Sequence, residues 1–465
     1  MRAHILPLPA RLLRRAFVAA TAAAVALGSV QTAAAQQKLP IVRDAEIEAL
    51  VRDYARPILK AAGLGNSGIE IVLVNDPSFN AFVAGRRIFV NTGALLSAET
   101  PNEIIGVLAH EAGHIAGGHQ QRLRDQLARA QTMAVLAGLL GVGAIAAGAA
   151  AESRGLGQAG MGLALGGSEM ARRSLLSYQR GEETTADRSA VTYLNKTGQS
   201  PRGMLKTFER FQSALALSGA QVDPYRISHP TPRDRIANLE ALAHESLYFD
   251  KADPPELQQR HDMMRAKIAA YTQGQGALQR LFRKGGDPLA KQYGAAAVAF
   301  LSGAPRAALP KIDALIKAQP KNPYFYELRA DALVKANQPA EAARAYATAV
   351  KLDPAKSGLL RIGYGQALLA IGTSEAAQQA AEQLRIGLDR DPENADGYRS
   401  LAQAYGQLGE IGEAELATAD GYYYSGAYNE AKIMAARAQQ KLKRGSPGWL
   451  RAQDIINTKS GKRKG

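Results

Sequence analysis

Two histidines four residues apart, His110 and His114, constrain this chain more than any other feature of its sequence. Residues at this spacing share one face of an α-helix, so both imidazoles can reach a single metal ion if the segment is helical. Just upstream, the Thr-Pro-Asn-Glu segment 100–103 predicts a helix start with a capping box and a proline in the first turn. The sequence therefore predicts a helix that begins near residue 100 and carries half of a metal site.

Glu111 lies between these histidines and completes the pattern H-E-x-x-H, which is typical of zinc-dependent peptidases. A third ligand must come from elsewhere and leave the fourth position of a catalytic zinc to water. His119 does not fit, because in the longer motif H-E-x-x-H-x-x-G-x-x-H the third histidine would fall at Gln120. The alternative interpretation is a buried helix whose histidines are satisfied by other groups.

Glu183 is the better candidate for the third ligand, at the polar start of another predicted helix. Asp187 follows it by one turn, on the same face, where a carboxylate can accept a hydrogen bond from the distal N–H of a ligating imidazole. Glu182 is the other acid at this point. The alternative is a solvated helix start that the helix dipole stabilises.

The sequence around these motifs resembles the zinc metallopeptidase family that includes HtpX and the CAAX prenyl endopeptidases. The family carries H-E-x-x-H followed by E-x-x-x-D, a segment similar to residues 80–95, and a motif similar to Ser228-His229-Pro230 followed by Arg235. The resemblance is strong from about residue 69 to residue 239 and architectural afterwards. Within the family, the chain is most similar to the soluble periplasmic branch with C-terminal tetratricopeptide repeats.

The resemblance implies a gluzincin-type domain with one Zn²⁺ per chain and Glu111 as the general base that acts on zinc-bound water. It also implies that Asp187 supports a ligand and that His229 lies near the metal, where it either assists the reaction or blocks the open position. As an alternative, His229 is only a turn residue before a proline. The implied metal ligands are His110, His114 and Glu183.

Two β-rich runs, residues 69–74 and 87–91, predict a small sheet beside the metal-binding helix. An edge strand there can bind an extended polypeptide through its backbone, with weak side-chain specificity. Alternatively, the strands serve only as core scaffold. The candidate substrate-binding residues are Asn80, Ala81, Phe82 and Val83.

Residues 1–35 have the features of a secretory signal peptide: arginines, an apolar run and a final small-residue segment. We therefore expect a periplasmic protein, although an uncleaved anchor is the alternative. The net charge of +15 comes from dispersed Lys and Arg, and no nucleic-acid-binding module is recognised, so nucleic acid is not an expected partner. The absence of cysteine means that the chain has no disulfide.

The segment 131–170 is apolar and rich in alanine and glycine, which favours a helical hairpin over a membrane span. We expect this hairpin to act as a lid over the active-site cleft and to contact a membrane surface. A core helix pair is the alternative. The metalloprotease domain is expected to cover residues 36–275.

Residues 285–465 are expected to form a second domain of tetratricopeptide-like repeats. Proline-punctuated helical pairs recur there at intervals near the 34-residue period of such repeats, which predicts an α-solenoid whose concave face binds a partner. The basic tail after residue 458 is expected to be disordered.

The sequence thus predicts a mainly α protein: a metalloprotease domain with a small β-sheet, followed by an α-solenoid. The predicted function is an exported zinc endopeptidase that degrades misfolded or stalled envelope proteins. The alternative is a chaperone or adaptor for outer-membrane protein assembly that acts mainly through the repeats. The expected partners are polypeptide substrates and the outer-membrane assembly machinery.

Overall fold

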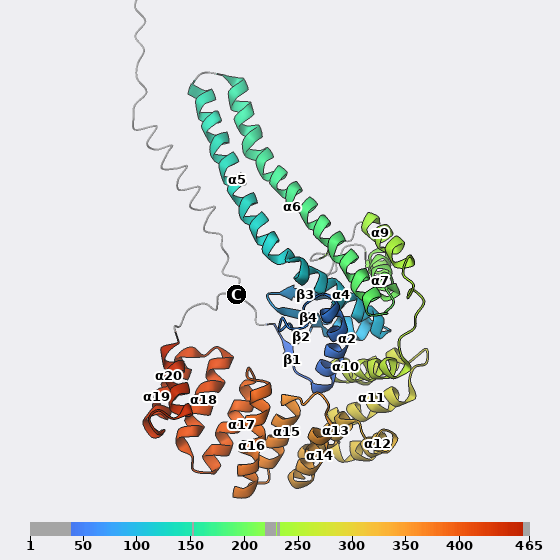
Figure 1. The fold of residues 1–465 in the computed structure, drawn as a ribbon, viewed down its shortest axis with the longest axis vertical. Helices are drawn as coiled ribbons and strands as arrows, with labels where there is room; N and C mark the ends of the chain where they lie inside the picture. Colours follow the sequence, from blue (N-terminus) through green and yellow to red (C-terminus); the bar gives the residue numbers. More distant parts are fainter. Residues whose placement is uncertain (1–38, 151–152, 219–228, 230–232, 459–465) are drawn as a thin grey trace, which may run out of the picture. The chain divides into compact units, whose positions relative to one another are not determined.

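The computed structural model describes residues 39–150, 153–218, 229 and 233–458, and they are mainly α-helical (Figure 1). The predicted signal peptide, the neighbours Ser228 and Pro230 of His229, and the basic tail after residue 458 lie outside the described residues. The predicted fold class, helical with a small sheet and a helical repeat, is confirmed.

A four-stranded mixed sheet has the order β1-β2-β4-β3. Strand β1 is antiparallel to β2, β2 is parallel to β4, and β3 is antiparallel to β4. Strands β2 and β4 confirm the two β-rich runs of the sequence, and β3 is left at an edge of the sheet. The bounds are β1 Ile41–Val42, β2 Glu70–Val74, β3 Ala81–Ala84 and β4 Arg87–Asn91.

Helices of the N-terminal half pack with this sheet around one apolar core. Large side chains such as Tyr54, Leu108 and Leu194 are fully buried there, and burial of each contributes on the order of 1.5–3 kcal/mol. These helices are α2 Ala45–Ala61, α3 Thr92–Ser97, α4 Pro101–Gly117, α6 Arg154–Lys196, α7 Arg202–Ser218, α9 Arg233–His244 and α10 Pro255–Leu281.

Helix α4 begins as the sequence predicts. Pro101 takes the first helical position, where a missing N–H costs nothing, and the Thr100 backbone N–H donates to Glu103 Oε1 at 3.2 Å. The start of the helix is thereby fixed, and with it the register of the H-E-x-x-H motif.

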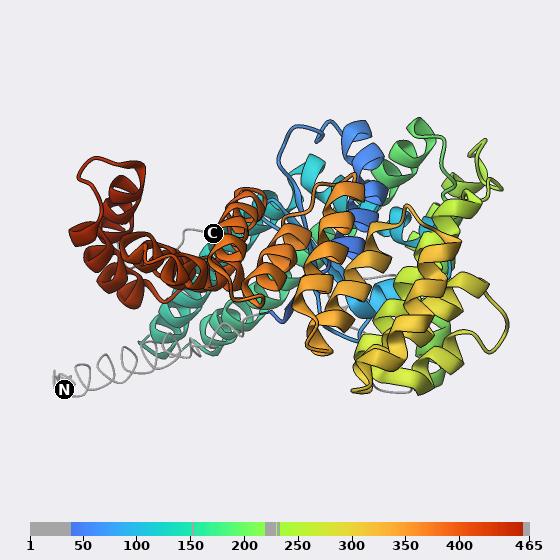
Figure 2. The same cartoon turned by 90° about the horizontal axis from the view of Figure 1, so that it is seen from below.

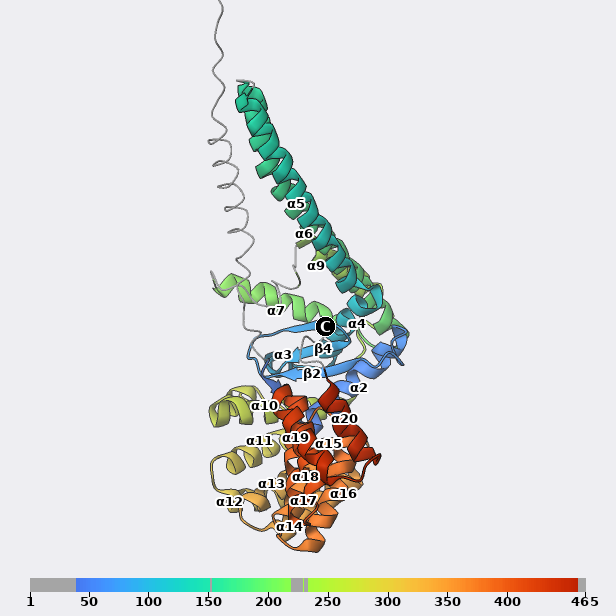
Figure 3. The same cartoon turned by 90° about the vertical axis from the view of Figure 1, so that its left-hand side faces the viewer.

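A long helical hairpin follows, in which α5 (His119–Ala150) runs side by side with α6 (Figures 1 and 3). Residues 131–150 and 153–170 form the outer part of these two helices, and both helices continue well beyond those limits. Several large apolar side chains of α5 are exposed: Met133, Val135, Leu136, Leu139 and Leu140. None of the helices in the described ranges is at once long and apolar enough to cross a membrane.

The C-terminal half is a series of helices in which each packs on the next, and Figure 2 shows them stacked in chain order. Several begin with proline at the first helical position, where the missing N–H costs nothing. The helices are α11 Pro288–Leu301, α12 Pro305–Ala318, α13 Pro323–Lys335, α14 Pro339–Leu352, α15 Gly358–Leu369, α16 Ser374–Arg390, α17 Ala395–Gln407, α18 Ile411–Ser425, α19 Tyr428–Lys441 and α20 Pro447–Asn457.

Helix α10 connects the two halves, because it packs against α2 and α3 and also against α11. It contains a kink at Gly274 (φ 72°) and ends at Leu281. A buried polar group lies at the same junction: Lys267 Nζ is 3.2 Å from Glu46 Oε2, and the Tyr293 hydroxyl donates to that oxygen at 2.6 Å. The predicted domain limits at residues 275 and 285 thus fall on and just after a shared helix, and they stay predictions.

Candidate metal centre

The H-E-x-x-H segment lies on the buried part of α4. His110 and His114 project from one face of the helix, and their Nε2 atoms are 3.0 Å apart. The expected helical placement of the motif is therefore present, with both imidazoles directed at one point.

Helix α6 brings Glu183 to that point. Glu183 Oε2 lies 3.3 Å from His110 Nε2, and its Oε1 lies 3.3 Å from His114 Nε2. The close approach of the helices depends on Gly113, because a Cβ there would lie 3.0 Å from the carbonyl oxygen of Ala186. The expectation that Glu183 lies at a helix start is wrong. Helix α6 is continuous from residue 154 to residue 196, because packing against α5 stabilises the helix across its polar stretch.

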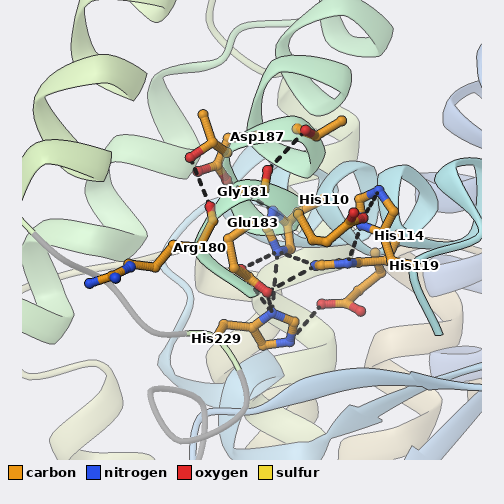
Figure 4. A network of polar contacts seen from close by, with 12 residues as sticks. His110, His114, His119, Arg180, Gly181, Glu183, Asp187 and His229 are labelled. Atoms are coloured by element: carbon orange, nitrogen blue, oxygen red, sulfur yellow. Dashed lines mark hydrogen bonds and ion pairs between the residues drawn. The ribbon is translucent and has the colours of Figure 1, made fainter. Parts of the chain in front are cut away.

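His229 completes a group of four side chains (Figure 4). Its Nδ1 lies 3.1 Å from Glu183 Oε1 and 3.3 Å from His110 Nε2. One potential ligand atom from each of the four residues lies within 4.8 Å of the others. Two ligand atoms at zinc-bond lengths from a tetrahedral ion are separated by about 3.3 Å, so this spacing fits one small cation.

Glu111 supplies an independent test of that fit. Its carboxylate is buried, and neither oxygen has a hydrogen-bond partner among the described residues. Burial raises the pKa of Glu111. His229 Nε2 is 3.5 Å from Glu111 Oε1. A buried orphan carboxylate beside two imidazoles and a second carboxylate suits a site that takes a divalent cation and a reacting molecule.

The ionisation of the group also favours a cation. Burial opposes the charged form of His110, but hydrogen bonds with Asp187 and Glu183 outweigh it and raise the pKa of His110 to about 9. Burial likewise opposes the ionised form of Glu183, yet hydrogen bonds with His110, His114 and His229 hold the pKa of Glu183 well below its usual range. Burial lowers the pKa of His114 to about 4. Without a metal, His110 holds a proton between the two carboxylates. A bound cation would supply that positive charge in place of the proton.

Asp187 holds the far side of the His110 ring. Its Oδ1 accepts a hydrogen bond from His110 Nδ1 at 2.9 Å, which directs Nε2 to the four-residue cluster. Arg235 fixes Asp187 in turn: its Nε donates to Oδ2 at 2.5 Å and its Nη2 to Oδ1 at 2.9 Å. Burial opposes the charge of Asp187, but the Arg235 guanidinium keeps its pKa below the usual value. Asp187 thus lies beside His110, and its role as the support of a metal ligand stays a prediction.

A cavity of about 170 Å³ opens beside the cluster and includes Glu111 and His114 in its lining. Of the four candidate substrate-binding residues, Phe82 and Val83 line it. Ala81 is buried in the core. The carbonyl of Asn80 accepts the Asn91 N–H within the sheet. The substrate-binding role of these four residues stays a prediction.

The base of the hairpin also lines this cavity, through Leu123 of α5 and the pair Tyr178 and Gln179 of α6. Residues 131–170 lie farther out along the two helices. Their role as a lid stays a prediction.

Gln120, which stands where the longer motif would have its third histidine, contacts the sheet directly. Its side-chain amide donates to the carbonyl oxygen of Val83 and accepts the N–H of Gly85 at 3.1 Å. The sequence carries no signal for this contact, because it depends on the turn between α4 and α5. The edge of β3 is therefore partly covered by a side chain that imitates a neighbouring strand.

Comparison with known proteins agrees with this geometry. Residues 42–243 match the model of Peptidase family M48. This segment of the chain is therefore similar to that family. Peptidases of this family depend on a metal ion, and the four-residue cluster lies within the matched segment.

Relatives cover both halves of the chain. The beta-barrel assembly-enhancing protease of Escherichia coli (strain K12) is 24% identical over 88% of this chain and 82% of its own length. The putative beta-barrel assembly-enhancing protease of Vibrio cholerae is 25% identical over the same shares. Among solved structures, the crystal structure of MamA covers 35% of this chain and 90% of its own, with 20% identity and a TM-score of 0.28.

Proposed function

We propose that this chain is an exported, zinc-dependent endopeptidase that cleaves misfolded or stalled envelope proteins, including proteins destined for the outer membrane. The observation that carries the proposal is the placement of four potential ligand atoms within 4.8 Å of one another, beside the buried carboxylate of Glu111, which accepts no hydrogen bond among the described residues. The match to Peptidase family M48 and the names of the E. coli and V. cholerae relatives support it.

His110, His114 and Glu183 would hold the zinc ion. Bound zinc polarises a substrate carbonyl and lowers the pKa of water to near 7. The Glu111 carboxylate is the proton acceptor, and its raised pKa suits it to return the proton to the leaving amine. His229 Nδ1 lies 3.1 Å from Glu183 Oε1 and 3.3 Å from His110 Nε2, so His229 would compete with water and substrate for the bound ion and would have to withdraw to admit them.

The substrate class follows from the edge position of β3. Asn80 bonds toward β4, and alternation along the strand directs the backbone groups of Ala81 and Val83 to the free edge. An extended polypeptide can pair with such an edge through its main chain. This supports cleavage of unfolded segments with weak preference for sequence.

The repeat helices and the hairpin supply the remaining partners of the proposal. An α-solenoid presents an extended surface for protein recognition, which suits recruitment of the outer-membrane assembly machinery. The exposed apolar side chains of α5 between Met133 and Leu140 suit contact with a membrane surface. Periplasmic location rests on the signal-peptide features of residues 1–35.

Glu111→Gln tests the catalytic part of the proposal, because it removes the proton acceptor and leaves the ligands in place. Zinc content should stay near one ion per chain, while cleavage of an unfolded protein should fall by at least about 100-fold. Cleavage at the wild-type rate would contradict the role of Glu111.

The same variant separates the protease from the adaptor alternative, which the helical repeats favour. Cells that lack the gene would be complemented with the wild type or with Glu111→Gln. We expect the variant to fail. Full complementation by it would instead assign the biological function to the repeats.

A further inference from the structure

A fourth histidine, His119, contacts the four-residue cluster through His114. Its Nδ1 lies 2.8 Å from His114 Nδ1, the nitrogen of His114 that faces away from the other ligand atoms, and the two rings meet edge to face at 86° (Figure 4). Gly117 makes room for the ring, because a Cβ there would lie 2.2 Å from His119 Nε2. The turn at Gly118 (φ 66°) then brings His119 back against α4.

The other nitrogen of His119 faces an acid. Its Nε2 lies 2.8 Å from Oε2 of Glu182, and the Arg122 Nη2 donates to the same oxygen at 2.8 Å. His119 and Glu182 are buried or nearly so, whereas Arg122 is half exposed. A continuous chain of polar contacts therefore runs from Arg122 through Glu182 and His119 to His114.

The donor and acceptor roles in this chain follow from what His114 must do as a ligand. If His114 Nε2 offers its lone pair to a metal, its Nδ1 carries the proton and needs an acceptor. The atom within reach is His119 Nδ1, which must then be unprotonated, so the proton of His119 is on Nε2. This nitrogen lies 2.8 Å from Glu182 Oε2, although the pair does not have hydrogen-bond geometry in this structure. The charge of Glu182 favours the proton on that nitrogen, and the proton on Nε2 leaves Nδ1 free to accept from His114.

His110 has an equivalent support on the opposite side. Its Nδ1 bonds to Asp187, and Arg235 holds Asp187. Asp187, paired with Arg235, contacts His110 directly. Glu182, paired with Arg122, reaches His114 only through the imidazole of His119. Helix α6 supplies both carboxylates, Glu182 and Asp187.

We propose that His119, oriented by Glu182, is a positioning residue that fixes the tautomer and ring orientation of the ligand His114. The proposal rests on the proposed function, since it assumes that His114 binds the metal. His119 is not itself a ligand: its two ring nitrogens face His114 and Glu182, and it is not among the four residues of the cluster. A residue that only fills space would need neither contact.

The test is metal affinity measured without turnover. The purified full chain and the variants His119→Phe and Glu182→Gln would be titrated with Zn²⁺ against a chromophoric chelator, and the absorption spectra of their Co²⁺ forms compared. Loss of a hydrogen bond to a ligand histidine weakens binding by about 10–100-fold. We expect that loss and an altered Co²⁺ spectrum for His119→Phe, and a smaller loss for Glu182→Gln.

Two comparisons keep the test specific. Gln121→Ala is the matched control: Gln121 is exposed, bonds only within its helix to Asp125 among the described residues, and should leave the affinity unchanged. The double variant combines His119→Phe with Glu182→Gln. Its loss of zinc affinity should equal that of His119→Phe alone, because Glu182 acts only through His119. Thermal unfolding with EDTA would verify that the metal-free fold is intact, and His119→Gln replaces His119→Phe if it is not.

The outcomes are distinguishable. If the wild type binds zinc and the folded His119 variant binds it within twofold of the wild type, the positioning role is wrong. The proposed metal centre is then unaffected. If the wild type binds no zinc, the proposed function fails and this inference fails with it. Additive losses of zinc affinity in the double variant would contradict the proposal that Glu182 acts through His119.

Discussion

Arg87 of β4 and Glu393, just before α17, form an ion pair with 3.1 Å between Nη2 and Oε2. The pair joins the sheet to the helical repeat, but the two side chains are 34% and 43% exposed. Solvent screens such a pair, so Glu393→Ala should lower the free energy of unfolding by less than about 1 kcal/mol. Urea unfolding at low and high salt measures it, and a larger loss would mean that the pair is the main link between the halves.

The buried group around Lys267 should behave differently. Lys267→Ala leaves Glu46 with its carboxylate buried and without its cation. Removing one partner of a buried pair costs about 3–5 kcal/mol. Tyr293→Phe, which removes a single hydrogen bond to the same carboxylate, should cost about 1.5–3 kcal/mol. The same unfolding experiment compares these variants, and equal losses would contradict the leading role of the cation.

Removal of the Gln120 amide should expose the free edge of β3. Because this amide occupies the backbone groups of Val83 and Gly85, Gln120→Ala should raise kcat/KM on an unfolded protein several-fold, mainly through a lower KM. Zinc content should not change, and Gln121→Ala again serves as control. A fall in kcat/KM would show that the amide binds the substrate rather than competing with it.

His229 should affect turnover more than metal content. His229→Ala leaves the ligands His110, His114 and Glu183 in place and opens the fourth position. We expect about one zinc per chain and faster cleavage of an unfolded protein, because the position for water and substrate is free. Unchanged turnover would reduce His229 to a turn residue, and loss of zinc would make it a required ligand.

Stability should depend on pH through His261, which is fully buried between the Tyr54 hydroxyl and the Ala98 carbonyl. Burial lowers the pKa of His261 from 6.5 to about 3. The unfolded chain therefore binds the proton first, so the stabilisation is complete above pH 6.5 and is lost as the pH falls toward 3. Between pH 7 and pH 5 this amounts to about 2 kcal/mol.

The pH dependence of unfolding for His261→Gln, compared with that of the wild type, isolates this contribution. Glutamine keeps polar atoms in the cavity but does not titrate. We expect the variant to lose less stability than the wild type over the same pH range. Parallel curves would show that other groups cause the acid sensitivity.

The four residues of the cluster differ in how far the sequence predicts their placement. His110 and His114 follow from helical spacing alone, because the i, i+4 relation fixes their common face. Glu183 needed the family resemblance as well, and its expected place at a helix start was wrong. Nothing in the local pattern shows that α6 runs through Gly181 and Glu182, since packing on α5 decides it.

The supports of the cluster could not be predicted in the same way. The register of the motif excludes His119 from the predicted ligands, and His119 is not among the four residues of the cluster. Its contact with His114 depends on the turn at Gly118 and on how closely α6 packs against α4. The contact of Gln120 with β3 has the same origin. The solenoid, by contrast, followed from recurrent prolines, since Pro320, Pro354 and Pro392 each lie in a turn a few residues before the next helix.

The four residues of the cluster come from α4, from α6 and from position 229, and α5 lies between the first two in the chain. A nascent chain that ends before Glu183 carries the H-E-x-x-H motif but neither Glu183 nor Asp187. The cluster can therefore assemble only after synthesis has passed His229, well beyond the motif itself.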